Sequence, residues 1–440
     1  MSHDAGAGQD PIATPSFSVS PVADVFSPPL DSSQNEGEWL GVRAEADSVL
    51  EGGEFCAPPP PKGEAGRGLD FANRWQELEW DDIGMQIRAK TAADVVRALS
   101  APRRTLADFM ALISPAAEAY LPQMAVEAER LTRQRFGNTI GFYVPLYLSN
   151  LCANDCTYCG FSMSNRLKRK TLNTEEIERE CLAIKARGFD SVLLVTGEHE
   201  HKVGLAYFRQ VLPIIRRHFS TVGMEVQPLS QAEYAELKSL GLDAVMVYQE
   251  TYHAPTYARH HLRGNKRDIA WRLATPDRLG RAGIDKIGLG ALIGLSSDWR
   301  ADSYFVAEHL SWLERHHWQS RYSLSFPRLR PCTGGLEPAV VMSDRQLAQL
   351  ICAWRLFSPT LDLSLSTRES ATFRNGAVRL GITQMSAESR TQPGGYAEGD
   401  AEELEQFAIH DDRPVGEVAA AVRQAGLQPV FKDWEPFLGR

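Results

Sequence analysis

Eight short runs of β-forming residues alternate with helical segments along most of this sequence, and no other feature limits the fold as strongly. The runs occupy residues 141–148, 191–196, 223–228, 244–249, 286–294, 322–326, 361–366 and 381–386. Several helical segments between them end at a glycine, such as Gly188, Gly241 and Gly283, which suits a helix C-cap. Strands that alternate with helices form parallel sheets. We therefore predict an α/β fold, a (β/α)8 TIM-type barrel, with a doubly wound open sheet as the alternative.

The chain divides into four predicted regions. Nine of the 25 prolines lie in the first 69 residues, which lack helical periodicity and cannot bury enough apolar surface to offset the entropy of ordering. This segment is either an extension without function or a docking tail. Apolar residues recur at three-to-four spacing from Leu106 to Arg135, which indicates helices. The regions are a disordered N-terminal extension (1–69), a helical lead-in (70–140), the barrel (141–390) and a C-terminal extension that packs on the barrel (391–440).

Charge and hydropathy exclude some classes of protein. The net charge of −9 argues against sequence-independent nucleic-acid binding, which needs a basic surface. No apolar run approaches the ~20 residues needed to span a bilayer. The N-terminus, MSHDAGAGQD, contains acids and lacks the apolar region of a signal peptide. We expect a cytoplasmic protein with no nucleic-acid or membrane partner.

Three cysteines crowd into the segment that follows the first β run. Cys152, Cys156 and Cys159 have the spacing C-x3-C-x2-C. Three thiolates on one loop can hold three irons of a [4Fe-4S] cubane and leave the fourth iron open. A structural zinc site would need four ligands, typically from two separated pairs, and the other cysteines form no such pair. We therefore favour the cluster over zinc. Tyr158 precedes the third cysteine, and its flat ring is suited to packing against a bound adenine.

Polar residues follow the other β runs as well. A barrel gathers its chemistry at the C-terminal ends of its strands, so residues in these positions are site candidates. His260 and His261 are adjacent, and on a helix their side chains point about 100° apart, so we expect helix-surface residues rather than a metal site. Arginines at a barrel mouth suit carboxylate recognition. The candidates are Glu198 after the second run, Glu250, Tyr252 and His253 after the fourth, Arg328 after the sixth, Arg368 after the seventh and Ser386 after the eighth.

These sequence segments resemble a known family. The three-cysteine loop with its aromatic residue is similar to the signature of radical S-adenosylmethionine enzymes. The wider context, including LSNLCANDCTYCGFSM, VMVYQETYH, YARHHLRG, SFPRLRPCTGG, LSLSTRES and TQPGGY, resembles the 2-iminoacetate synthases, the tyrosine lyases of thiamine biosynthesis. The likeness extends from about Phe71 to Arg440 and does not include residues 1–69.

The resemblance implies a cytoplasmic radical lyase. Electron transfer from a [4Fe-4S] cluster to S-adenosylmethionine would produce methionine and a 5′-deoxyadenosyl radical. Hydrogen abstraction from L-tyrosine would then break its Cα–Cβ bond, giving 2-iminoacetate (dehydroglycine) and p-cresol. The implied partners are a thiazole synthase, which consumes the imine, and a reductant such as flavodoxin. The implied fold is a radical S-adenosylmethionine barrel with additional N- and C-terminal elements.

Site residues carry over with different strength. Cys152, Cys156 and Cys159 match the cluster ligands, and Glu198 matches the position that binds the amino group of S-adenosylmethionine. For the substrate the resemblance implies only a neighbourhood, and the residue that handles the phenol proton is not assigned. That neighbourhood comprises Glu250, Tyr252, His253, Arg328, Arg368 and Ser386.

Three other interpretations remain at this point. The tyrosine lyase that matures [FeFe]-hydrogenase carries a second C-terminal cysteine motif, whereas no cysteine follows Cys352 here. A lyase of another aromatic amino acid, such as tryptophan, would differ only in the shape of its pocket. A non-catalytic Fe–S or zinc scaffold would need neither an open iron nor ligands at the other strand ends.

Overall fold

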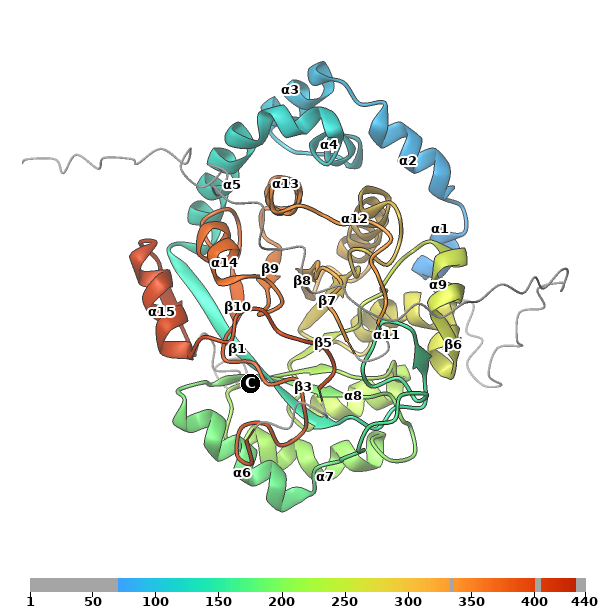
Figure 1. Cartoon of the computed structure of the whole chain (residues 1–440). Helices are drawn as coiled ribbons and strands as arrows, with labels where there is room; N and C mark the ends of the chain where they lie inside the picture. The colour runs from blue at the N-terminus through green and yellow to red at the C-terminus, as the bar shows by residue number, and fades with distance from the viewer. Residues whose placement is uncertain (1–69, 333–334, 400–404, 433–440) are drawn as a thin grey trace, which may run out of the picture. The chain divides into compact units, whose positions relative to one another are not determined.

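The computed structural model describes residues 70–332, 335–399 and 405–432, and the predicted extension over residues 1–69 lies outside them. Within the described residues, eight parallel strands form a closed barrel (Figure 1), as predicted. Strand β1 pairs with β3 on one side and with β10 on the other, where Tyr143 lies opposite Ser386. The strands are β1 (Thr139–Ser149), β3 (Ser191–Thr196), β4 (Thr221–Glu225), β5 (Ala244–Met246), β7 (Lys286–Gly290), β8 (Arg321–Ser325), β9 (Asp362–Leu365) and β10 (Gln384–Ser386).

Side chains of β1 alternate between the two faces of the barrel wall. Phe142, Val144 and Leu146 are buried on the outer face. Tyr143 and Tyr147 project to the inner face and line a pocket. A strand changes face at every residue, so one face packs against helices while the other is available for chemistry.

Helices surround the barrel and connect its strands (Figure 1). Three of them begin with a capping box, in which Asn173, Ser230 or Ser343 accepts a hydrogen bond from the backbone of the third helical residue. Gly188, Gly241 and Gly283 have positive φ values, which confirms their predicted role just after helix ends. The helices are α6 (Thr174–Ala186), α7 (Leu205–Arg216), α8 (Gln231–Ser239), α9 (Ala254–His260), α10 (Ile269–Leu273), α11 (Thr275–Arg281), α12 (Trp299–His316), α13 (Asp344–Phe357) and α14 (Ala371–Ala377).

A group of helices precedes the barrel and packs on its outer helices. Phe109 contacts Trp354 of α13 with ring centroids 4.6 Å apart. The helical periodicity from Leu106 to Arg135 corresponds to two helices joined by a 3-10 turn that begins at Pro115. The elements are α1 (Phe71–Trp75), α2 (Trp80–Arg88), α3 (Ala92–Ser100), α4 (Leu106–Leu112), η2 (Pro115–Tyr120) and α5 (Leu121–Phe136).

The C-terminal part of the chain returns to the barrel. Helix α15 (Val415–Gln424) leads into β11 (Gln428–Val430), which pairs in parallel with the first residues of β1. Before α15, the segment 405–411 crosses the strand ends, where the amide of Ala408 donates to Pro331 and that of His410 to Thr367. None of the helices in the described residues is long and apolar enough to cross a membrane.

A buried ion pair attaches this C-terminal segment to the barrel. The side chains of Arg374 in α14 and Asp411 are both fully buried and form a salt bridge, and Arg413 donates to the same carboxylate. Removal of one member of a buried pair leaves an uncompensated charge. The pair therefore holds segment 405–411 across the strand ends.

We expect Asp411→Ala to lower the free energy of unfolding by ~3–5 kcal/mol, because Arg374 would stay buried without its counter-ion. Urea denaturation followed by circular dichroism measures this change. Glu236→Ala, which removes the exposed pair of Glu236 with Arg209, is the control and should change the unfolding midpoint little. Equal midpoint shifts in the two variants would contradict the role of Asp411.

Candidate active site

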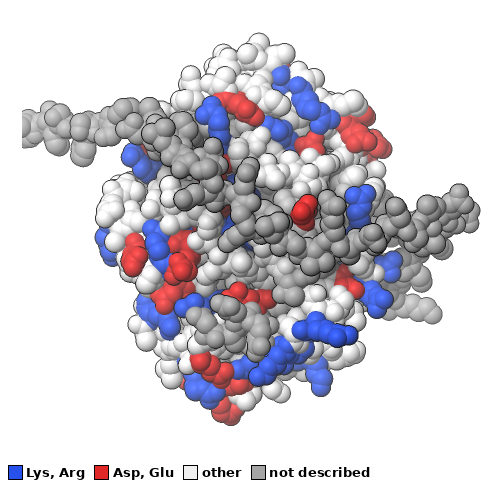
Figure 2. Space-filling view, viewed as in Figure 1, with Lys and Arg blue, Asp and Glu red and all other residues white. Residues whose placement is uncertain are grey.

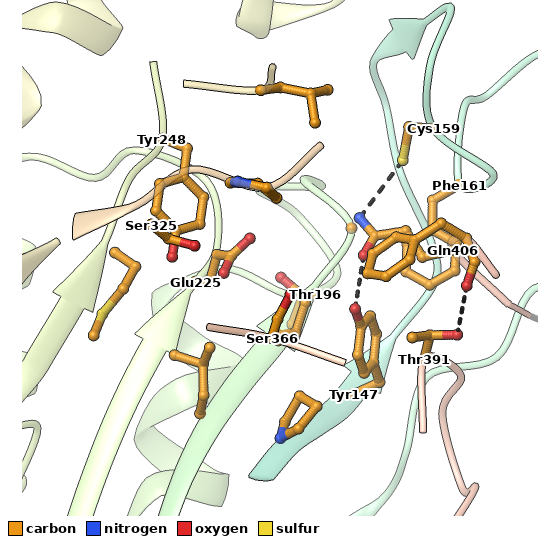
Figure 3. A pocket seen from close by; sticks show the side chains of 18 of the residues that line it. Tyr147, Cys159, Phe161, Thr196, Glu225, Tyr248, Ser325, Ser366, Thr391 and Gln406 are labelled. Atoms are coloured by element: carbon orange, nitrogen blue, oxygen red, sulfur yellow. Dashed lines mark hydrogen bonds between the residues drawn. The ribbon is translucent and has the colours of Figure 1, made fainter. Parts of the chain in front are cut away.

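One pocket lies at the C-terminal ends of the barrel strands. The three cysteines of the predicted cluster loop line it. Its wall also includes residues of strands β1, β3, β4, β5, β8 and β10, and Gln406 and Phe407 of the C-terminal segment. Figure 3 shows that side chains from distant parts of the sequence point into this space. The location is the one at which a parallel barrel is expected to carry its chemistry.

The cysteine loop is fastened to its neighbours by backbone hydrogen bonds. The amide of Ala153 donates to Glu198 (2.8 Å), and that of Gly197 donates to Ser149 (2.8 Å). A short strand within the loop, β2 (Asp155–Cys156), pairs antiparallel with β6 (His261–Arg263). These bonds fix the loop between the end of β3 and the segment after α9.

The donors in this loop are thiols, the ligand type that iron–sulfur clusters take. Cys156 is buried, and Cys152 and Cys159 pack against Tyr147, Phe161 and Val195. Burial, the nearby Glu198 and the neighbouring thiols raise the pKa of Cys152 to about 11. Thiolates therefore need a metal centre in this apolar environment, and cluster binding must release protons. Three sulfur donors would leave one iron of a cubane open for another ligand.

Gln406 of the C-terminal segment contacts the third cysteine. Its Nε2 lies 3.6 Å from Cys159 Sγ, and its Oε1 accepts a hydrogen bond from the hydroxyl of Tyr147 at 2.7 Å (Figure 3). The backbone oxygen of Gln406 accepts a hydrogen bond from Gly160, where an added Cβ would lie 2.6 Å from that oxygen. Glycine is thus required at position 160 for the close approach of the two segments.

Glu198 lies at the end of β3 in a confined position. The preceding residue has no room for a side chain, since a Cβ on Gly197 would lie 2.4 Å from the oxygen of Leu151. The carboxylate accepts from Arg272 (3.0 Å) and from Asn154 Nδ2 (2.7 Å). Burial raises the pKa of Glu198, but Arg272 and Lys266 outweigh it, and the net pKa is lowered. The side chain is therefore an ionised acceptor at the pocket wall.

Glu250 forms the second half of a buried charge network. Its Oε1 lies 2.8 Å from Lys266 Nζ and 3.8 Å from Arg272, which also binds Glu198. Glu250 has a φ of 67°, a left-handed conformation that is unfavourable for a residue with a side chain. Such strain concentrates at functional sites. Two acids and two bases thus neutralise one another beside the cysteine loop.

The prediction for His260 and His261 was wrong, because both side chains are buried rather than on a helix surface. Helix α9 ends at His260, and the chain turns into β6 against the cysteine loop. His261 Nδ1 lies 2.6 Å from the carbonyl of Tyr257, so Nδ1 carries the proton. His261 Nε2 consequently accepts from the hydroxyl of Tyr158 at 2.7 Å, which orients that ring in the pocket wall.

The six predicted substrate residues separate into two groups. Glu250, Arg368 and Ser386 line the pocket. The Arg368 guanidinium lies 3.5 Å from the ring centroid of Phe407, stacked on the C-terminal segment. Arginine in this arrangement can present its planar donors to a carboxylate.

Tyr252, His253 and Arg328 do not line the pocket. The hydroxyl of Tyr252 lies 3.0 Å from His309 Nδ1 in the protein core. His253 precedes α9 and stacks on Trp80. Arg328 is engaged by Glu369 and Asp344. The structure therefore corrects the expected neighbourhood, because these side chains are already occupied in packing and ion pairs.

Other pocket residues were missed from the sequence. Lys266 and Arg272 lie well after the fourth β run. The only sequence feature that could have indicated them is the high density of charged residues in segment 262–272. Glu225 is an isolated acid at the end of an apolar run, a signal that sequence patterns do not distinguish from an exposed turn. Tyr143, Tyr248, Ser325 and Gln406 carried no signal.

Comparison with known proteins agrees with this geometry. Residues 146–305 match the radical SAM superfamily, and residues 325–428 match the biotin and thiamin synthesis associated domain. The chain is 67% identical over 370 residues to 2-iminoacetate synthase of Escherichia coli. The aligned region covers 84% of this chain and 98% of that relative. The enzyme of Salmonella typhimurium is 66% identical with the same coverage.

Solved structures show related barrels. HydG, a maturase of the [FeFe]-hydrogenase, is similar with a TM-score of 0.72 and 30% identity, over 82% of this chain and 78% of that chain. Methylornithine synthase (PylB) has a TM-score of 0.62 at 19% identity, over 77% of this chain and 97% of that one, and shares the fold.

The barrel, the three-cysteine loop and the superfamily match together define a radical S-adenosylmethionine enzyme. Its cofactors are a [4Fe-4S] cluster and S-adenosylmethionine. The chain belongs to the 2-iminoacetate synthase family of carbon–carbon lyases in thiamine biosynthesis, and the scaffold alternative is not favoured.

We expect Cys156→Ala to fold as a barrel but to lose the visible absorbance and iron of the cluster, since only two sulfur ligands would remain. Iron content after anaerobic reconstitution measures the loss. Cys352→Ala, which changes a buried cysteine of α13 far from the loop in sequence, is the control and should retain iron. Unchanged iron content in Cys156→Ala would contradict the ligand assignment.

We expect Gln406→Leu to make the reduction potential of the cluster more negative. A donor to a ligand sulfur stabilises the reduced cluster, and leucine removes the amide beside Cys159. A redox titration followed by electron paramagnetic resonance measures the shift. Gln424→Leu, an exposed position on α15, is the matched control. An unaltered potential in Gln406→Leu would show that the amide has no electronic effect.

Proposed function

We propose that this pocket cleaves the Cα–Cβ bond of L-tyrosine to 2-iminoacetate and p-cresol, with the cluster held by Cys152, Cys156 and Cys159. The observation that carries the proposal is the convergence of the cysteine loop with an ionised carboxylate and a mouth arginine in one pocket of a 2-iminoacetate synthase relative. When bound, the reduced cluster and S-adenosylmethionine supply the 5′-deoxyadenosyl radical that removes a hydrogen atom from tyrosine.

Glu198 is suited to the amino group of S-adenosylmethionine. Its carboxylate lies beside the cysteine loop, because the amide of Ala153 donates to the backbone of Glu198 itself. Its two oxygens each accept one hydrogen bond from the protein and retain lone pairs for an ammonium donor. The lowered pKa keeps the acceptor charged at neutral pH. The ring of Tyr158 lines the same pocket and is available to the adenine.

Arg368 is suited to the carboxylate of tyrosine. It lines the pocket, and no carboxylate of the described residues forms a salt bridge with it. Its contact with Phe407 holds the guanidinium plane in place, so a planar carboxylate can be bound through two donors. Ser386 lies nearby in the sheet, where its hydroxyl accepts from the amide of Thr367 and its face opens to the pocket.

The C-terminal segment forms part of the pocket wall, and we expect it to limit the access of water. Gln406 and Phe407 lie at its wall, with Phe407 against Arg368 and Gln406 against Cys159. Exclusion of water and of adventitious hydrogen donors is what the protein must provide when the cofactor supplies a radical.

The wider context follows from the chemistry. 2-Iminoacetate hydrolyses in water, so we include in the proposal a thiazole synthase that takes up the imine directly and a reductant such as flavodoxin. Free cysteine thiols persist in reducing surroundings, which supports a cytoplasmic location.

The decisive experiment supplies L-tyrosine, S-adenosylmethionine and a reductant to the anaerobically reconstituted enzyme. We expect p-cresol and 5′-deoxyadenosine to form together, and Cys156→Ala to form neither. L-tryptophan in parallel tests the other aromatic substrate. Abundant 5′-deoxyadenosine without p-cresol would reject tyrosine as the substrate, and no 5′-deoxyadenosine at all would reject the enzyme class.

A further inference from the structure

Glu225 is a pocket carboxylate that the roles described so far leave unused. It is the last residue of β4 and lines the same pocket as the cysteines and Arg368. Figure 3 shows its side chain in the interior of the barrel beside Tyr248 and Ser325, away from Cys159 and Gln406. It therefore lies in a part of the pocket that differs from the cluster wall.

The carboxylate of Glu225 has no hydrogen-bond or ion-pair partner in the part of the chain that the structure describes. No hydrogen bond or ion pair to it occurs among residues 70–332, 335–399 and 405–432, whereas Glu198 and Glu250 are both paired with cations. The two phenol groups nearby are satisfied by serines, since Tyr143 is 3.0 Å from Ser364 and Tyr248 bonds to Ser325. Glu225 is half-buried, and an unpaired carboxylate in such a pocket is unfavourable, so its oxygens are available to a donor from a ligand.

The surroundings of Glu225 suit an aromatic ring. The side chains of Tyr143, Tyr248 and Met246 line the pocket around it and offer flat or flexible apolar walls. Burial, followed by repulsion from Glu250, raises the pKa of Glu225 to about 7 and outweighs the attraction of Arg368, Lys266 and Arg272, which indicates an environment that is poor in water. A site of apolar walls with one polar group is typical of a pocket that fixes the orientation of a ring with one hydroxyl.

Tyrosine has a carboxylate, an ammonium group and a phenol, and the pocket offers separate partners to the carboxylate and to the phenol. Arg368 is complementary to the carboxylate, and the charged network of Glu198, Glu250, Lys266 and Arg272 lies at the cluster side. The aromatic surroundings of Glu225 remain for the phenol. We propose that Glu225 determines the specificity for tyrosine by accepting a hydrogen bond from the phenol hydroxyl. This inference rests on the proposed function.

A protein that recognises a hydroxyl in this way should discriminate against phenylalanine. Phenylalanine would leave the carboxylate unpaired, and hydrogen bonds to charged groups correspond to roughly 10- to 100-fold in affinity. The alternative is that Glu225 binds the ammonium group, which tyrosine and phenylalanine share. The two roles therefore differ in the ratio of affinities and not in the affinity for tyrosine alone.

The test measures binding of L-tyrosine and L-phenylalanine by equilibrium dialysis. It uses reconstituted holoenzyme with S-adenosylmethionine and without reductant, so that no turnover occurs. Glu225→Leu removes the acceptor, and we expect the preference for tyrosine to fall from roughly 10- to 100-fold to about unity while phenylalanine affinity is retained. Glu225→Gln keeps a neutral acceptor of the same shape and should lose about five- to tenfold in tyrosine affinity. Glu175→Gln, at an exposed position of α6, is the control with unchanged binding.

Iron content and circular dichroism establish whether the variants fold. If Glu225→Leu does not fold, the affinities of Glu225→Gln decide the outcome. An unchanged preference for tyrosine would overturn the inference, as would an equal loss of affinity for both amino acids. Formation of p-cresol by the unaltered enzyme is scored separately. Its absence would reject the proposed function, whereas its presence with an unchanged preference in the variants would reject the role of Glu225 alone.

Discussion

Strand β1 pairs with β10 on one side and with β3 on the other, and this pairing closes the sheet into a barrel. Because all eight barrel strands of the described chain are parallel, closure brings their C-terminal ends around one space. Cys152 follows β1, Glu198 follows β3 and Arg368 follows β9. The residues are far apart in sequence, and only the closed sheet places them in one pocket.

Electrostatic balance in that pocket depends on buried pairs. Arg272 forms a salt bridge with Glu198, and Lys266 forms one with Glu250. Four charges therefore lie in a poorly solvated environment, and the positive and negative charges of the group balance. Isolated charges would be too costly there, and each would lose its charge by a shift in pKa. Glu225 has no such partner among the described residues, and burial together with repulsion from Glu250 raises its pKa. Among the described residues, Glu198 and Glu250 are thus held by cations, whereas the carboxylate of Glu225 forms no salt bridge.

The C-terminal segment completes the site by returning across the strand ends. Its attachment through Asp411 and Arg374 places Gln406 against Cys159 and Phe407 against Arg368. The same segment therefore contacts a cluster ligand and a candidate substrate arginine. The region matched to the biotin and thiamin synthesis associated domain includes this segment, which contributes directly to the pocket of the radical SAM barrel.

The sequence by itself determined the fold and the metal chemistry. Strand and helix periodicity is local, so all eight barrel strands were located. The C-x3-C-x2-C spacing predicts the cluster loop because the three cysteines are close along the chain. Tertiary structure decided which strand-end residues face the pocket. Arg328 forms a salt bridge with Glu369 and does not line the pocket. His260 and His261 are buried because the chain after α9 turns into β6, which pairs with the cysteine loop. Glu225 and Gln406 became recognisable as pocket residues only through contacts across long sequence separations, which no local pattern encodes. For Lys266 and Arg272 the charged segment 262–272 was the only local signal.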